Sequence, residues 1–258
     1  MSWISPTTRE ETFVSPHDKS HQNYLLAEFG DGALSAGPLL VLYLHGALSN
    51  QQQGMTPEIY HDAFGRLAKW MSERDAIYIC PEYRGNSWMG PAAEDDVREI
   101  FRAARERYRP RKTLLLGGSM GGTSALIFAA RNPDSVDGVL AFCPATDMAA
   151  MYNVAAHPRF PKHFSESLNE SYGGTPDQIP EVYRERSVRY HIASLTPYRL
   201  AIIHGTADEI MPVENIHQLV ADLRAANSPV RYQEIEGGNH DAPLIADYLP
   251  LLDWLAEG

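Results

Sequence analysis

Short, mostly apolar runs recur along the chain, separated by stretches long enough for a helix. They are LLVLYL (39–44), AIYIC (76–80), TLLLG (113–117), VDGVLAFC (136–143), RLAIIH (199–204) and VRYQEI (230–235). Because apolar and polar residues hardly alternate in these runs, they are typical of strands buried on both faces of a parallel sheet. Two further strands are expected before them, at 9–15 and 22–29, joined by a turn at 16–18.

Several of these runs are separated by segments with the periodicity of amphipathic helices. In EDDVREIFRAARERY (94–108), apolar side chains recur on one stripe and charged side chains occupy the rest of the surface. The segment ENIHQLVADLRAAN (214–227) has the same pattern. Alternating strands and helices predict an α/β fold, a doubly wound and mostly parallel sheet that forms a single domain over residues 1–258.

The stretch 145–195 interrupts this alternation. It contains MYNVAAHPRFPKHF and ESYGGTPDQIPEVYRERS, which are rich in proline and turn-forming residues. Insertions between core strands are where such folds carry covers over their functional sites. We therefore expect 145–195 to be a lid or cap insertion.

Charge and cysteine content exclude several classes of protein. Acidic residues outnumber Lys and Arg by 33 to 22, which gives a formal net charge of -11 and argues against binding to nucleic acid or membranes. The N-terminal sequence lacks the basic start and apolar stretch of a signal peptide. Cysteine occurs only at positions 80 and 143, so neither a disulfide framework nor a zinc site is expected. These features favour a cytoplasmic protein.

One serine, Ser119, is flanked by glycines in TLLLGGSMGGTSALIFAARNP (113–133), where a predicted strand ends and a helix begins. Glycine weakens the interior of either element by about 0.5–1 kcal/mol relative to alanine, so these glycines need a reason. The pattern G-x-S-x-G between a strand and a helix is typical of a nucleophile elbow, in which a sharp turn raises the serine hydroxyl above the sheet. The alternative is a packing turn with an incidental serine, because the motif alone also occurs by chance.

A serine nucleophile needs a histidine base, and the histidine needs a carboxylate that orients it. In chains with this elbow, the acid and the histidine follow the serine in that order, each in a loop after a strand. Asp208 in GTADEIMP and His240 in EGGNHDAP follow the last two apolar runs. Glu209, and Asp147 after the preceding strand, remain alternatives for the acid.

Two backbone N–H groups are expected to form an oxyanion hole. One belongs to Met120, directly after Ser119, and the other to Ala47, in the loop after the first buried strand. Each such donor is typically worth about 10²–10³ in turnover. His45 and His204, which end strands, are expected to fix loops.

Six segments carry a resemblance to a known superfamily: YLHGA, PEYRGNSW, GGSMGG, YGGTPDQIPEVYRERSVRYHI, IIHGTADEIMPVENIHQL and EGGNHD. The chain resembles the α/β-hydrolases, and within them it is similar to the catalytic domain of the prolyl oligopeptidase family and to related small esterases. The resemblance covers most of the chain after residue 38. It implies that Ser119, Asp208 and His240 form a catalytic triad that works without a metal or organic cofactor.

Departures from the large peptidases of that family shift the expectation towards esters. The loop after His45 and Gly46 reads Ala-Leu-Ser-Asn instead of the Gly-Gly-Pro type, and a propeller domain has no counterpart before position 39. We expect a serine hydrolase that cleaves carboxylic esters of a small or medium substrate, such as acyl or feruloyl sugar esters, through an acyl-enzyme. A small serine peptidase or amidase and a non-catalytic hydrolase-fold binding protein remain alternatives, and the oligomeric state stays open.

Side chains in the loops around the site are candidates for substrate contacts. They are Trp88, Met89, Tyr152 and Met211, each of which could equally pack beneath the lid. Arg84, in the segment YRG, is expected to anchor its own loop.

The resemblance also bears on the two cysteines. In the strand order that it implies, two strands separate the strands that end at Cys80 and Cys143, so the thiols lie roughly 14 Å apart. A disulfide bridges at most about 7 Å between α-carbons. Both thiols are therefore expected to be free and buried.

Overall fold

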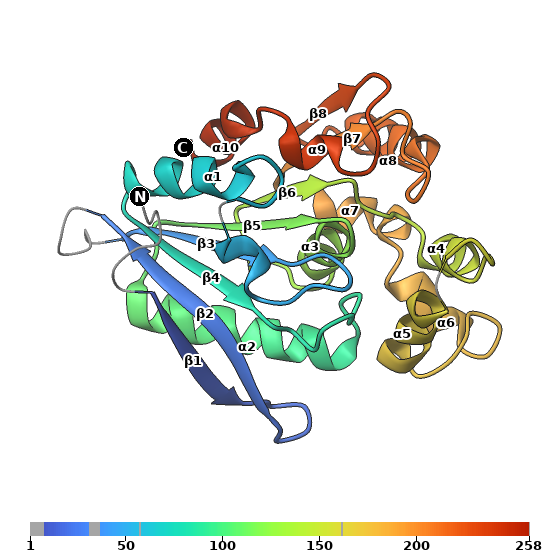
Figure 1. Cartoon of the computed structure of the whole chain (residues 1–258), viewed down its shortest axis with the longest axis horizontal. Coiled ribbons are helices and arrows are strands. Elements are labelled where there is room, and N and C mark those ends of the chain that lie inside the picture. The colour runs from blue at the N-terminus through green and yellow to red at the C-terminus, as the bar shows by residue number, and fades with distance from the viewer. Residues whose placement is uncertain (1–7, 31–36, 57, 161, 258) are drawn as a thin grey trace.

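The computed structural model describes residues 8–30, 37–56, 58–160 and 162–257. Its strands form one 8-stranded sheet in the order β1-β2-β4-β3-β5-β6-β7-β8 (Figure 1). They are β1 (Arg9–Val14), β2 (His21–Phe29), β3 (Leu39–Leu44), β4 (Ala76–Pro81), β5 (Lys112–Gly118), β6 (Gly138–Phe142), β7 (Arg199–Gly205) and β8 (Val230–Ile235). Strands β3 to β8 run parallel, and β1 and β2 form an antiparallel pair at one edge. The predicted mostly parallel α/β sheet is confirmed.

Helices cover both faces of this sheet. They are α1 (Ala63–Ser72), α2 (Pro91–Tyr108), α3 (Met120–Arg131), α4 (Met148–Ala155), α5 (His163–Tyr172), α6 (Pro180–Glu185), α7 (Ile192–Leu195), α8 (Val213–Ala225), α9 (Ala242–Ile245) and α10 (Leu249–Ala256), with short 3-10 helices η1 (Gln53–Met55) and η2 (Val188–Tyr190). In β3, Leu40 and Leu42 belong to the core beneath α2, α3 and α8, whereas Val41 and Tyr43 belong to the core beneath α1 and α10. Successive side chains of a strand point to opposite faces, so one apolar run fills both cores.

The last strand departs from the expectation of burial on both faces. Along β8, Arg231 and Glu234 are exposed and the other four side chains are half-buried. The strand lies at the edge of the sheet and pairs only with β7. An edge strand is covered less completely than a central one, which explains why VRYQEI contains charged residues.

Residues 145–195 fold into helices between β6 and β7. Figure 1 shows α4, α5 and α6 together, beyond the ends towards which the arrows of β5 and β6 point. A buried ion pair ties this segment to the body of the fold, because Arg186 Nη2 lies 2.8 Å from Glu94 Oε2 of α2. Arg186 also donates to the carbonyl of Met89, and Arg131 of α3 pairs with the same carboxylate at 2.9 Å.

The two cysteines lie where the implied strand order puts them. Cys80 is in β4 and Cys143 follows β6, with β3 and β5 between these strands. Both thiols are free and buried, as predicted. Within the described residues, no helix combines the length and apolar character needed to cross a membrane.

Candidate active site

Ser119 occupies the sharp turn between β5 and α3. Its backbone has φ 56° and ψ -119°, outside the regions that helices and strands use. A Cβ at Gly117 would lie 2.4 Å from the backbone of Gly121, and one at Gly121 would lie 2.0 Å from the carbonyl oxygen of Leu44. Real side chains cannot approach backbone so closely, so the turn requires glycine at both positions.

The three sequence-predicted residues meet in one hydrogen-bonded chain. His240 Nε2 lies 2.9 Å from Ser119 Oγ, and His240 Nδ1 lies 2.7 Å from Asp208 Oδ2. Asp208 follows β7 and His240 follows β8, so neighbouring parallel strands deliver both side chains to the edge where Ser119 emerges. The other carboxylate oxygen of Asp208 accepts the backbone N–H groups of Ile210 and Met211, at 2.8 and 2.9 Å.

The two alternatives for the acid, Asp147 and Glu209, take part in other interactions. Asp147 accepts the N–H of Ala150 at the start of α4 and pairs with Arg189 at 3.0 Å. Glu209 contributes its backbone carbonyl to Arg159 Nη2, at 2.7 Å. The carboxylate that contacts the imidazole of His240 belongs to Asp208.

Burial and neighbouring charges shift the pKa values of Asp208 and His240. For Asp208, burial raises the pKa, but the hydrogen bond and charge of His240 and two backbone N–H groups outweigh it, so the pKa lies below its ordinary value. For His240, burial lowers the pKa, but the interactions with Cys143 and with the carboxylate of Asp208 outweigh it and the pKa is raised. The imidazolium form of His240 is therefore stabilised at this site.

Cys143 is a close neighbour of the imidazole that the sequence did not single out. Its Sγ lies 4.0 Å from His240 Nε2, and its backbone has a positive φ of 40°. Cys143, Asp208 and His240 offer ligand atoms within 4.8 Å of one another, a spacing that a metal ion could use. The imidazole, however, already contacts Asp208 and Ser119 through its two nitrogens.

Two further histidines hold loops at this edge. His204 Nε2 lies 2.7 Å from the carbonyl oxygen of Met211 and 3.4 Å from Asp208 Oδ2, and burial lowers its pKa. His45 contacts the carbonyl oxygens of Gly46 and Glu82, at 2.8 and 2.9 Å. Both lie in the loop-fixing positions expected of them.

The loop after β3 presents one unpaired N–H between two paired ones. The N–H of Gly46 donates to Gln53 Oε1 at 2.8 Å, and the N–H of Leu48 donates to Asn86 Oδ1 at 2.7 Å. The N–H of Ala47, between them, has no acceptor among the described residues. Ala47 lines the same cavity as Ser119, while Met120 is the first residue of α3, where helix N–H groups lack intrahelical acceptors.

A cavity of about 150 Å³ surrounds the Ser119 hydroxyl. Its apolar wall includes Trp88, Met151, Phe164, Met211 and Leu244. Trp88 and Met211 were predicted from the sequence. Met151 and Phe164 come from α4 and α5, and only the expectation of a lid pointed to their segment.

Two other predicted substrate contacts do not line this cavity. Met89 is completely buried in the core, and Tyr152 is half-buried with its ring 6.0 Å from that of Tyr183. Met89 packs in the core and Tyr152 packs against Tyr183. Arg84, as expected, anchors its own loop, with ion pairs to Asp96 and Asp18 at 2.6 Å.

The sheet order, the elbow and the order of the three loops define an α/β-hydrolase fold. Residues 63–257 match the model of the prolyl oligopeptidase family, and the chain belongs to that family. The chain is a serine hydrolase of the prolyl oligopeptidase and esterase type.

Similar proteins include both esterases and peptidases. The uncharacterized protein YfhR of Salmonella typhimurium is 24% identical over 243 residues, which are 92% of this chain and 76% of that protein. Esterase LipC of Mycobacterium tuberculosis is 38% identical over 72 residues, 28% of this chain and 18% of that protein. The structure of the Staphylococcus aureus serine hydrolase FphF has a TM-score of 0.75 at 16% identity, with 98% and 99% of the two chains covered. A puromycin hydrolase has a TM-score of 0.73 at 17% identity, with 97% of this chain and 39% of that chain covered.

Proposed function

We propose that this protein hydrolyses carboxylic esters with small acyl groups through an acyl-enzyme intermediate. The observation that carries the proposal is the hydrogen-bonded chain from Ser119 through His240 to Asp208. In the proposed reaction, His240 accepts the proton of Ser119 as the hydroxyl oxygen attacks the ester carbonyl. His240 then protonates the leaving alcohol and activates water, while Asp208 keeps the imidazole in the productive tautomer.

The oxyanion of the tetrahedral intermediate would be held by the N–H groups of Ala47 and Met120. Ala47 lines the cavity next to Ser119, and the N–H of Met120 belongs to the helix that starts at the nucleophile. Charge that develops on the carbonyl oxygen would also meet the positive end of the α3 dipole.

The size of the cavity supports the assignment to small acyl groups. Its volume of about 150 Å³ is well below the roughly 300–1,000 Å³ of pockets that hold drug-sized ligands. Phe164 and Met151 from residues 145–195 form part of its wall, and we propose that this segment acts as a lid over the site.

A small peptidase or amidase is the second candidate. Membership in the prolyl oligopeptidase family favours it, and one structural neighbour is a puromycin hydrolase. The same three residues could attack an amide carbonyl, with His240 protonating an amine instead of an alcohol. Relative rates on matched esters and amides separate the two candidates.

The test is labelling by a fluorophosphonate probe together with turnover of short nitrophenyl esters and aminoacyl amides. We expect labelling at Ser119 and higher kcat/KM on the esters. Ser119→Ala should fold normally, lose labelling and reduce turnover by about 10⁶. A clean preparation of this variant with more than a tenth of the wild-type activity would contradict the assignment. A folded wild-type protein that is neither labelled nor active would instead be a binding protein.

A further inference from the structure

The side-chain amide of Gln53 has hydrogen bonds at only one of its two ends. Its Oε1 accepts the N–H of Gly46 at 2.8 Å and the hydroxyl of Tyr43 at 3.4 Å. Its Nε2 has no acceptor among the described residues. Because an amide nitrogen carries two N–H donors, Gln53 holds the loop of Ala47 with one end and keeps two unpaired donors at the other.

The unpaired end of this amide is open to the cavity that contains Ser119. Gln53 lines this cavity and is only 9% exposed. Within the described parts of the chain, Nε2 is not among the fully enclosed polar atoms that lack a partner, so the cavity gives access to it. A substrate that fills the cavity excludes water from Nε2. Such a substrate binds better if it supplies an acceptor in return.

The amide lies against the turn that carries Ser119. A Cβ at Gly46 would lie 3.8 Å from Nε2 of Gln53 and 3.6 Å from the carbonyl oxygen of Gly118, the residue before the nucleophile. The hydroxyl of Tyr43, which donates to the same amide, would lie 3.5 Å from a Cβ at Gly118. The donors of Nε2 and the hydroxyl of Ser119 therefore border one small cavity, of about 150 Å³.

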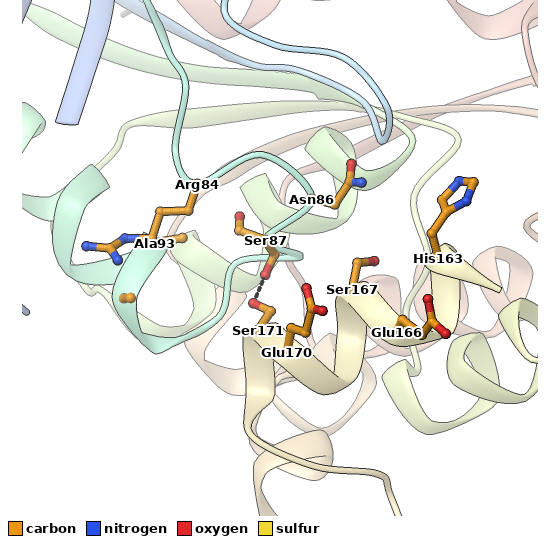
Figure 2. Close-up of a pocket in the computed structure, with 10 residues that line it drawn as sticks. Arg84, Asn86, Ser87, Ala93, His163, Glu166, Ser167, Glu170 and Ser171 are labelled. Atoms are coloured by element: carbon orange, nitrogen blue, oxygen red, sulfur yellow. Dashed lines mark hydrogen bonds between the residues drawn. The ribbon is translucent and has the colours of Figure 1, made fainter. Parts of the chain in front are cut away.

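Trp88 lines this cavity but donates its indole N–H elsewhere. Its Nε1 lies 3.0 Å from the acceptor Ser167 Oγ, on α5. Figure 2 shows α5 beside the loop that carries Ser87, where Ser171 Oγ donates to the carbonyl oxygen of Ser87. These two hydrogen bonds fix the loop of Trp88 on α5. The indole therefore contributes apolar surface to the cavity and no donor.

The remaining donors of the cavity wall leave Gln53 as the most buried one without an acceptor. The imidazole of His240 contacts Asp208 and Ser119 through its two nitrogens. Among the described residues that line the cavity, the hydroxyl of Tyr60 is the other side-chain donor without an acceptor. Tyr60 is half-buried, whereas Gln53 is nine-tenths buried. An acceptor supplied by the substrate therefore matters most at Gln53.

We propose that Gln53 selects acyl groups that carry an oxygen acceptor, such as an ether oxygen, near the ester carbonyl. This inference rests on the proposed function, in which a small acyl group enters the cavity. Nε2 donates to the acyl oxygen while Oε1 continues to hold the N–H of Gly46. An acyl group of the same size without the oxygen leaves both donors unpaired and binds less well.

Turnover is tested with the nitrophenyl esters of methoxyacetic acid and butanoic acid. The two acyl groups have the same number of non-hydrogen atoms, and an ether oxygen, which only accepts hydrogen bonds, replaces a CH₂ group. Each kcat/KM is divided by the rate constant for hydroxide hydrolysis of the same ester, because the ether oxygen also activates the carbonyl. We expect a corrected preference of roughly 2- to 10-fold for the methoxyacetate.

Two variants assign this preference to one donor. Gln53→Glu keeps an oxygen acceptor for Gly46 and replaces the amide donors with a carboxylate that only accepts, so it should abolish the corrected preference. Tyr60→Phe is the matched control, because it removes the other unpaired donor of the wall and should leave the preference in place. A preference that is absent from the wild type, that survives Gln53→Glu, or that is lost in Tyr60→Phe alone would overturn the proposal.

A binding experiment keeps the proposal separate from catalysis. The ¹⁵N-labelled Ser119→Ala protein is titrated with methyl methoxyacetate, and with methyl butanoate for comparison, while NMR follows the side-chain NH₂ signals of Gln53. These signals are assigned by their absence when Gln53→Glu or Gln53→Leu is added. We expect a saturable downfield shift with the methoxyacetate and a smaller one with the butanoate. Absence of the shift, or equal shifts with both esters, would contradict the proposed contact. Failure of ester hydrolysis with the shift intact would contradict only the proposed function.

Discussion

The N–H group of Ala47 has no acceptor among the described residues, whereas the N–H groups on either side of it donate to side-chain amides. Gln53 accepts the N–H of Gly46 at 2.8 Å, and Asn86 accepts that of Leu48 at 2.7 Å. Gln53 is largely buried and lines the cavity beside Ser119. We therefore regard it as a positioning residue for the proposed oxyanion hole.

Replacing Gln53 tests this role. Gln53→Leu leaves the buried N–H of Gly46 without an acceptor, so the peptide before Ala47 should shift. We expect kcat to fall roughly 10- to 100-fold, with KM nearly unchanged, because an oxyanion hole stabilises the transition state more than the bound ester. Gln53→Glu keeps an oxygen acceptor and should retain more of the activity. Equal losses in both variants, or a change confined to KM, would argue against positioning.

The thiol beside the imidazole should set the pH dependence of turnover. Activity requires neutral His240, so it rises with pH through the pKa of this group. The contact with Cys143 helps to raise that pKa above its ordinary value of about 6.5. Cys143→Ala removes this contact, and the acidic limb of the kcat/KM profile should move to lower pH. The measurement is kcat/KM against pH with a neutral ester. An acidic limb that stays where it is in the wild type, or that moves to higher pH, would contradict the prediction.

At the scale of elements, one buried carboxylate joins α2, α3 and the segment 145–195. Glu94 is paired with Arg186 and Arg131, and burial raises its pKa less than these arginines lower it. Glu94→Ala leaves Arg186 buried and unpaired, which should cost about 3–5 kcal/mol of unfolding free energy. Urea denaturation measures this loss. Glu99→Ala, which removes a half-buried partner of the exposed Arg102, is the control and should cost less than about 1 kcal/mol.

The proposed lid should act on substrate size. Phe164 on α5 reaches the wall of the cavity that contains Ser119. Phe164→Ala would enlarge this cavity, so the optimal acyl chain should lengthen while the rate on acetate esters changes little. A series of nitrophenyl esters from acetate to octanoate measures the preference. If the preference stays where it is in the wild type, the segment does not limit the acyl group.

At the scale of the whole molecule, the parallel sheet brings distant parts of the chain to one edge. The strands before Ser119, Asp208 and His240 are β5, β7 and β8, and their carboxyl ends all point the same way. Ligand sites in open parallel sheets lie at this edge for the same reason. The order also keeps β3 and β5 between the strands of Cys80 and Cys143, which excludes a bridge between the two thiols.

The sequence by itself determined the elements and the order of the reactive loops. Continuous apolar runs predict parallel strands because a strand covered on both faces admits few polar side chains. The glycines around Ser119 predict the elbow because a Cβ at Gly117 or Gly121 would strike backbone. These constraints are local, so a short segment of sequence is enough to recognise them. Asp208 and His240 were expected from the order of the loops, and their distances to each other and to Ser119 came from the fold.

Only the tertiary structure decided which side chains gather around the serine. Met89 and Tyr152 looked like substrate contacts but face other packing, whereas Phe164 and Gln53 line the cavity. Cys143 beside His240 shows the same limit, because its place depends on how β6 and β8 are spaced in the sheet. Such contacts join residues far apart in the chain, and no local pattern of residues records which distant side chain completes them.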